Sequence, residues 1–154
     1  MIFFFIALLT GYRLGFSSFG PVRIGMTPRQ VERSLSVTLV GGPGEPQDCE
    51  QMHVASDPGI SFMFESGKLT RFDIKDAHHK TISGLRVGAT ENAAKKIYGD
   101  RLSVSPHKYV KGGHYLTLVS ADKKFALVIE TDGKYVTAMR AGKLQSAQYV
   151  EGCS

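Results

Sequence analysis

The sequence predicts an α+β protein of two tandem units, each a helix followed by an antiparallel sheet, with both helices packed on one face of the joined sheet. Three observations support this prediction. The chain has 154 residues, 42% of them apolar, which is enough for one hydrophobic core. A short motif at residues 22–27 recurs at residues 85–90. Each copy is followed by the strand–turn–strand pattern of a β-hairpin.

We expect residues 21–154 to form one domain of two repeats, about 21–76 and 81–153, with a polar linker at 76–80. A lone unit of about 60 residues buries little apolar surface. The two units are therefore expected to join their sheets. The sheet face away from the helices is then free to be solvated or to bind a partner.

The first 20 residues differ in composition from the rest of the chain. Residues 2–9 are an uninterrupted apolar run, and small and polar residues follow it. A run of this length matches the hydrophobic core of a signal peptide, so we interpret residues 1–20 as a signal peptide or hydrophobic leader. The alternative is that the run forms the first strand or helix of the domain. No apolar stretch reaches the roughly 18 residues of a membrane-spanning helix, so we expect no transmembrane span in the mature chain.

The only two cysteines, Cys49 and Cys153, lie outside this leader. In an oxidising compartment they could pair and close a loop of about 100 residues, which in the chain-entropy model stabilises a fold by roughly 4–5 kcal/mol. The alternative is two unrelated buried thiols. Together with the leader, the pair predicts a periplasmic or secreted protein with a disulfide.

The repeated motif is expected to begin a helix in each copy. It has the form apolar-Arg-apolar-Gly-x-Thr, and Thr27 and Thr90 are candidate N-caps. Gln30 completes a capping box with Thr27, and Pro28 suits the first helical position. The apolar residues that follow have the i, i+3, i+4 spacing of a helix with one buried face. They are Val31 and Leu35 in the first copy, and Ala94, Ile97 and Tyr98 in the second.

Glycine-containing turns at residues 66–68 and 131–134 predict one hairpin in each copy. The flanking strands are expected at 61–65, 69–74, 127–130 and 135–140, with further strands near 51–55, 108–110 and 115–119. Residues 41–46 are expected to form a loop. Strict alternation along the strand would place Leu69, Arg71 and Asp73 on one face.

The segment Ile24-Gly25-Met26-Thr27-Pro28-x-x-Val31 resembles the helix entry of tandem helix-plus-sheet modules in bacterial envelope proteins. These are the β-lactamase-inhibitor-protein-like folds and the small outer-membrane lipoprotein modules of the SmpA/OmlA type. Residues 85–90 match the pattern less well, and residues 149–153 are similar to the ending of uncharacterised secreted bacterial proteins. The resemblance implies binding to proteins, as an inhibitor or in envelope assembly. The chain lacks the lipidated cysteine of the lipoprotein branch, and it has no Trp.

Histidines are the weak candidates for metal binding. Of the five, His107 and His114 flank the turn Gly112-Gly113 and could approach each other. A metal ion needs a third and a fourth ligand, and no compelling ligand lies nearby in the sequence. We therefore predict no metal site and no cofactor.

No recognisable arrangement of nucleophile and base is present. The acids Asp73 with Asp76, and Glu130 with Asp132, are typical of turns. A catalytic thiol would require an unpaired cysteine and a histidine base. We therefore predict that the protein is not an enzyme.

The formal charge is +5, with at most two basic residues adjacent, so we expect no nucleic-acid binding. Tyrosine and arginine are enriched in protein interfaces, which makes a group in the C-terminal half a candidate interface. Its members are Tyr109, Tyr115, Tyr135, Arg140 and Tyr149. The alternative is that the tyrosines occupy amphipathic strand positions.

The sequence thus predicts an exported, non-catalytic protein-binding module of inhibitor, immunity or envelope-assembly type with an unknown protein partner. The alternatives are a small-molecule- or metal-binding envelope protein and a hydrolase of unrecognised type.

Overall fold

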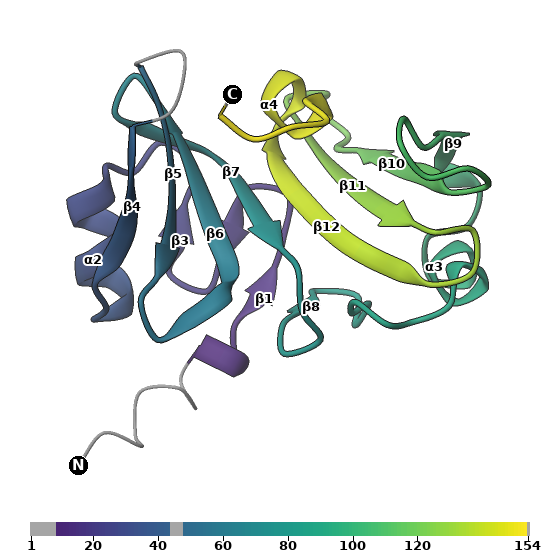
Figure 1. Ribbon diagram of the computed structural model, residues 1–154, viewed down its shortest axis with the longest axis horizontal. Coiled ribbons are helices and arrows are strands. Elements are labelled where there is room, and N and C mark those ends of the chain that lie inside the picture. The colour runs from purple at the N-terminus through teal and green to yellow at the C-terminus, as the bar shows by residue number, and fades with distance from the viewer. Residues whose placement is uncertain (1–8, 44–47, 154) are drawn as a thin grey trace.

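Eight antiparallel strands form the main sheet of the molecule (Figure 1). The computed structural model describes residues 9–43 and 48–153, which are mainly strand with a few short helices. The strand order is β4-β5-β6-β7-β12-β11-β10-β9. The bounds are β4 (Leu39–Pro43), β5 (Cys49–Val54), β6 (Asp57–Glu65), β7 (Lys68–Ile74), β9 (Ser103–Pro106), β10 (His114–Val119), β11 (Phe125–Thr131) and β12 (Val136–Lys143).

A second, small sheet has the order β3-β2-β1-β8, with β1 parallel to β8. Its strands have two residues each: β1 (Arg13–Leu14), β2 (Ser18–Phe19), β3 (Val22–Arg23) and β8 (Lys80–Thr81). The helices are α2 (Pro28–Leu35), α3 (Glu91–Tyr98), α4 (Leu144–Gln148) and the 3₁₀ turn η1 (Gly99–Arg101).

Two groups of four strands meet in the middle of the large sheet. β7 pairs with β12 in a register that sets Ile74 opposite Met139 and Phe72 opposite Ala141. The hairpins predicted around residues 66–68 and 131–134 are present as β6–β7 and β11–β12. The chain is therefore predominantly β, with helices added to two sheets.

The two edge strands differ from the prediction. β4 includes Gly41, although residues 41–46 were expected to form a loop. Gly41 has a φ of 139°, and a Cβ there would lie 2.4 Å from the carbonyl oxygen of Gln51, so only glycine allows this strand to approach β5. At the other edge of the sheet, a strand was expected at residues 108–110, but the edge strand is β9. Nδ1 of His107 accepts hydrogen bonds from the main-chain N–H groups of Tyr109 and Val110 and turns the chain there.

A β-bulge changes the expected alternation in β7. The register shifts so that Met63 faces Arg71 while Phe64 faces Leu69. Thr70 is the extra residue, and its hydroxyl donates to the carbonyl of Met63. Leu69 therefore enters the core, and the predicted face shared by Leu69 and Arg71 is wrong.

The helix caps agree with the sequence. Thr27 and Gln30 form the reciprocal capping box, and the hydroxyl of Thr90 accepts from the N–H of Ala93 at 3.0 Å. Ala94 and Tyr98 of α3 are buried as predicted, whereas Ile97 differs from the prediction because it is 38% exposed.

One large hydrophobic cluster lies between the large sheet and a layer made of α2, α3 and the small sheet. Phe19 of the small sheet packs near Phe72, with ring centroids 6.4 Å apart, and Phe72 packs edge-on against Phe62 at 5.9 Å. All three side chains are fully buried. This burial holds the small sheet against the large one.

The folded part of the chain begins earlier than residue 21. Leu9, Leu14 and Phe19 are buried in the core, so residues 9–20 pack with the rest of the described chain, and the leader at residues 1–20 stays a prediction. Residues 1–8, which hold most of the apolar run, lie outside the described residues. Within the described part of the chain, no helix is long and apolar enough to span a bilayer.

A buried polar pair also joins the two sheets. Nε2 of His79 lies 2.7 Å from Oδ2 of Asp57, and both side chains are buried. The hydrogen bond to His79 outweighs burial and holds the pKa of Asp57 below its ordinary value. The carboxylate form of Asp57 is thus favoured by folding.

Asp57→Asn should lower the free energy of unfolding by about 1–3 kcal/mol at neutral pH, because it weakens a buried hydrogen bond. The contribution of Asp57 is full above its unfolded pKa of about 3.9 and is lost as the pH falls through the lower folded value. Urea unfolding at several pH values should therefore show the difference from wild type shrinking below about pH 4. Asp100→Asn, at an exposed position, is the control. A difference that grows towards low pH would contradict this role of Asp57.

Candidate functional site

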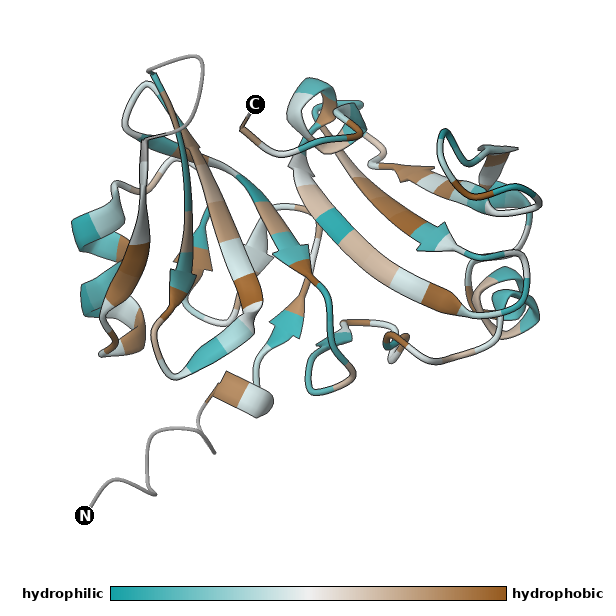
Figure 2. Cartoon of the chain, in the orientation of Figure 1, coloured by the Kyte–Doolittle hydropathy of each residue, from teal (hydrophilic) through white to brown (hydrophobic). Residues whose placement is uncertain are grey.

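The face of the large sheet that points away from α2, α3 and the small sheet is polar at its centre, and we call it the open face. In β7, Phe72 and Ile74 enter the core, so Arg71 and Asp73 point to the open face. In β12, Met139 and Ala141 enter the core, so Arg140 points to the open face. Figure 2 shows a hydrophilic band in the middle of this otherwise mainly apolar strand. The open face thus presents charged side chains from the two central strands.

The last part of the chain crosses this face (Figure 1). We call residues 144–153 the C-terminal strap. Its helix α4 places Ala147 in a small hydrophobic cluster with Tyr115, Ala126 and Val128. The strap therefore covers the part of the open face formed by β10 and β11.

Arg71 binds the main chain of the strap. Its Nη1 lies 3.1 Å from the carbonyl oxygens of Ser146 and Tyr149, and 3.2 Å from that of Glu151. Its Nε donates to Asp73 at 2.8 Å. The carbonyl of Ser146 lies in α4, and those of Tyr149 and Glu151 follow the helix. Arg71 thus fixes the course of the strap.

Arg140 makes a second main-chain contact. Its Nε donates to the carbonyl of Ala147 at 2.7 Å, and its Nη1 pairs with Glu130. The other oxygen of Glu130 lies 2.8 Å from Nε2 of His107, and the guanidinium carbon of Arg140 is 5.5 Å from the ring centroid of Tyr115. Burial lowers the pKa of Arg140, and the charge of Glu130 opposes this shift. Arg140 is therefore a buried cation that depends on these partners.

Side-chain bonds hold the strap at further points. Cys153 forms a disulfide with Cys49 of β5 across a sequence separation of 104 residues. The hydroxyl of Ser146 donates to Glu65 at 2.6 Å. The predicted pairing of the two cysteines is therefore present, and it ties the chain end to the first group of strands.

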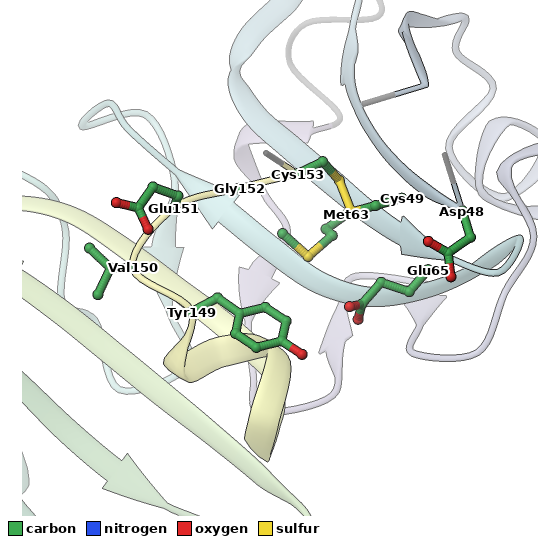
Figure 3. A pocket seen from close by; sticks show the side chains of 9 residues that line it. All are labelled: Asp48, Cys49, Met63, Glu65, Tyr149, Val150, Glu151, Gly152 and Cys153. Carbon is green, nitrogen blue, oxygen red and sulfur yellow. A yellow bond between two sulfur atoms is a disulfide. The ribbon is translucent and has the colours of Figure 1, made fainter. Parts of the chain in front are cut away.

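Two cavities flank residues 149–153 of the strap. One, of about 400 Å³, is lined by the disulfide, Met63 and Glu65, with Tyr149 and Glu151 on the other side (Figure 3). The second, of about 420 Å³, is lined by the charged side chains at the centre of the open face and by the strap. These side chains are Arg71, Asp73, Lys75, Glu130, Arg140 and Glu151. The strap thus fills only part of the open face.

The predicted interface residues differ in how much of each is exposed to solvent. Tyr109, Tyr135 and Tyr149 are 64%, 42% and 40% exposed, but Tyr115 and Arg140 are only 9% and 3% exposed. The strap covers the latter two, so Tyr115 and Arg140 are not exposed on this face, and the interface of five residues stays a prediction. Tyr109 lies beside the strap and donates its hydroxyl to Glu151. Tyr135 lies in the β11–β12 turn, bridged to Thr90 before α3.

The two candidate metal ligands point to opposite faces of the sheet. His107 contacts Glu130 on the open face, whereas Nδ1 of His114 lies 2.6 Å from Glu91 of α3. Burial raises the pKa of Glu91, but hydrogen bonds from Thr131 and His114 outweigh it and the pKa lies below its ordinary value. His107 and His114 therefore do not share a ligand position, and the idea of a pair is wrong. Among residues 9–43 and 48–153, no group of three or more His, Cys, Asp or Glu side chains could hold a metal ion.

Arg71, which contacts Asp73 and three strap carbonyls, was not among the predicted site residues. Its only signal is the sequence Arg71-Phe72-Asp73, in which two opposite charges lie two positions apart on a predicted strand. Such residues are common on solvated strands. The strap carbonyls that Arg71 contacts lie 75 to 80 residues later along the chain.

Comparisons with known proteins show a shared fold only. No protein-family model matches the sequence, and no curated protein matches it. Among solved structures, the chain is similar to the crystal structure of the uncharacterized protein YfeY from Escherichia coli. The TM-score is 0.56 at 10% identity, over 85% of this chain and 99% of that chain.

Arg71→Met should lower the free energy of unfolding by about 3–5 kcal/mol, because it leaves Asp73 and the strap carbonyls without a buried partner. Arg71→Lys should give an intermediate loss, since lysine keeps the charge but not the planar fork. Urea unfolding is the measurement. The exposed Arg86→Met is the matched control and should stay within about 0.5 kcal/mol of wild type. Equal stability of the Arg71→Met and Arg86→Met variants would contradict the role given to Arg71.

Proposed function

We propose that the protein is an exported, non-catalytic module that binds a protein partner at the open face beside the C-terminal strap. The wider proposal is that it consists of two tandem helix-and-sheet units, related in architecture to the β-lactamase-inhibitor-protein-like and SmpA/OmlA-type modules. Inhibitor, immunity and envelope-assembly roles are all compatible with such binding.

Matching main-chain hydrogen bonds support the two-unit organisation. The N–H of Gly25 donates to Leu69, whose own N–H donates to Met26. In the second unit, the N–H of Gly88 donates to Val136, whose N–H donates to Ala89. Gly25 and Gly88 have φ values of 98° and 92°, which favour glycine. The repeated sequence motif is thus attached in the same way to the last strand of each unit.

The disulfide supports export. Paired cysteines persist mainly in oxidising compartments, and the Cys49–Cys153 bond is compatible with an extracytoplasmic protein. A periplasmic or secreted location is part of the proposal.

The observation that carries the binding function is the pair of cavities beside the strap. They lie on a sheet face where Tyr149 and Glu151 are exposed, and Tyr109 and Lys108 contact Glu151 at its edge. Aromatic and charged side chains around a recess suit a protruding loop of a partner. Two pairs of charged side chains that line the second cavity are engaged with each other, Arg71 with Asp73 and Arg140 with Glu130, which favours binding over catalysis.

A photo-crosslinking amino acid in place of Tyr149 should capture one partner protein from an envelope extract. The same amino acid in place of Tyr135, which is similarly exposed but lies in the β11–β12 turn, should not. Tyr149→Asp should weaken binding of the captured protein by about tenfold or more, the effect of losing an aromatic anchor. Capture through position 135 alone would place the interface elsewhere, and capture of no protein at either position would count against the proposal.

A small polar ligand is the second candidate, because Oε1 of Gln51, which lines the 420 Å³ cavity, is buried without a hydrogen-bond partner among the described residues. A ligand N–H or O–H could reach this acceptor. A ligand bound there should raise the unfolding temperature of the wild type, and Gln51→Ala should abolish that rise. A rise that survives in the variant would place the ligand at another site.

A further inference from the structure

We propose that the open face is a peptide-binding groove that the C-terminal strap occupies in cis, and that reduction of the Cys49–Cys153 disulfide lets an extended segment of a partner protein replace the strap. This inference rests on the proposed function. It adds that the partner binds as an extended segment and that reduction of the disulfide controls access to the site.

The groove recognises main chain more than side chains. Arg71 contacts the carbonyl oxygens of Ser146, Tyr149 and Glu151, and Arg140 contacts that of Ala147. Carbonyl groups occur at every residue of every peptide. The same guanidinium groups can therefore accept another chain of suitable shape.

The side-chain contacts define which peptides fit. Ala147 is fully buried against Tyr115 and Val128, so the occupant needs a small residue there. Val150 packs on the same cluster, and Ser146 donates to Glu65. The expected partner segment has a hydroxyl residue, a small residue next to it and an aliphatic residue three positions later.

The disulfide closes the groove. While the bond is intact, the strap is attached at both ends, to β12 at Leu144 and to β5 at Cys49. It then cannot leave without disturbing the sheet. After reduction, the strap is attached only to β12. It then competes for the groove as a tethered ligand, and a free peptide can displace it at sufficient concentration.

The position of the disulfide allows it to be reduced. Cys153 is partly exposed, Cys49 is buried, and both line the 400 Å³ cavity (Figure 3). A thiolate of an external dithiol attacks Sγ of Cys153, which breaks the Sγ–Sγ bond and releases the Cys49 thiolate. The second thiol of the dithiol then displaces Cys153, so the dithiol becomes a disulfide and both cysteines become thiols.

Once the strap is released, Arg71 and Arg140 lose the carbonyl acceptors that it supplies. Both guanidinium groups then face water on the open face. An incoming peptide that supplies carbonyl groups can restore these hydrogen bonds.

The direct test uses the full chain with a displaced strap. The double variant Ala147→Arg with Cys153→Ser has no disulfide, and its strap no longer fits the space that Ala147 fills. A fluorescent peptide with the sequence of residues 144–152 is the probe, and fluorescence anisotropy measures its binding. We expect binding to the double variant, and binding at least about tenfold weaker to the oxidised wild type. Adding Arg71→Met to the double variant should weaken binding of the peptide by about tenfold or more.

Matched controls separate the groove from non-specific binding. A peptide carrying arginine at the position of Ala147 should not bind, and Arg86→Met in the double variant should leave the affinity unchanged. No binding of the native peptide to a folded double variant, or equal binding to the oxidised wild type, would overturn the inference.

A second measurement applies if the double variant does not fold. Hydrogen exchange of residues 144–152 in the wild type should accelerate by about tenfold or more when a dithiol is added, while exchange in β11 stays unchanged. Unchanged exchange of the strap would overturn the inference. Neither experiment uses a partner protein, so their failure leaves the crosslinking result to decide the proposed function separately.

Discussion

Two guanidinium groups buried at the junction of the two strand groups determine how the open face is built. Arg71 lies on β7 and Arg140 on β12, the strands that join the halves of the large sheet. A buried charge must find acceptors. Asp73 and Glu130 supply two of them, and the main chain of the strap supplies the rest. The end of the chain is therefore part of the site.

The two faces of the large sheet have different tasks. One face packs in a continuous hydrophobic cluster with the helices and the small sheet, and Nε2 of the buried His79 is paired there with Asp57. The other face carries charged groups, a short strap and two cavities. The hydrophobic cluster thus lies on the first face, and the binding function that we propose uses the second.

Local features of the sequence predicted local structure well. The capping box at Thr27, the cap at Thr90 and the turns at 66–68 and 131–134 depend on residues only a few positions apart. The cysteine count indicated the pairing of Cys49 with Cys153, though it left unpaired thiols open. The edge strand β4 was missed because Gly41 is typical of loops, and it joins the sheet only where a close approach to β5 requires glycine.

What the sequence by itself determined is the set of elements: mainly strands, two capped helices and a cysteine pair, all encoded by short-range spacing and composition. Only the tertiary structure decided the rest. It placed Leu14 and Phe19 in the core and Tyr115 and Arg140 beneath the strap, and it turned His107 and His114 to opposite faces. These outcomes depend on strand register and on contacts between residues far apart in the chain, such as Arg71 with Tyr149, and no local pattern carries that information.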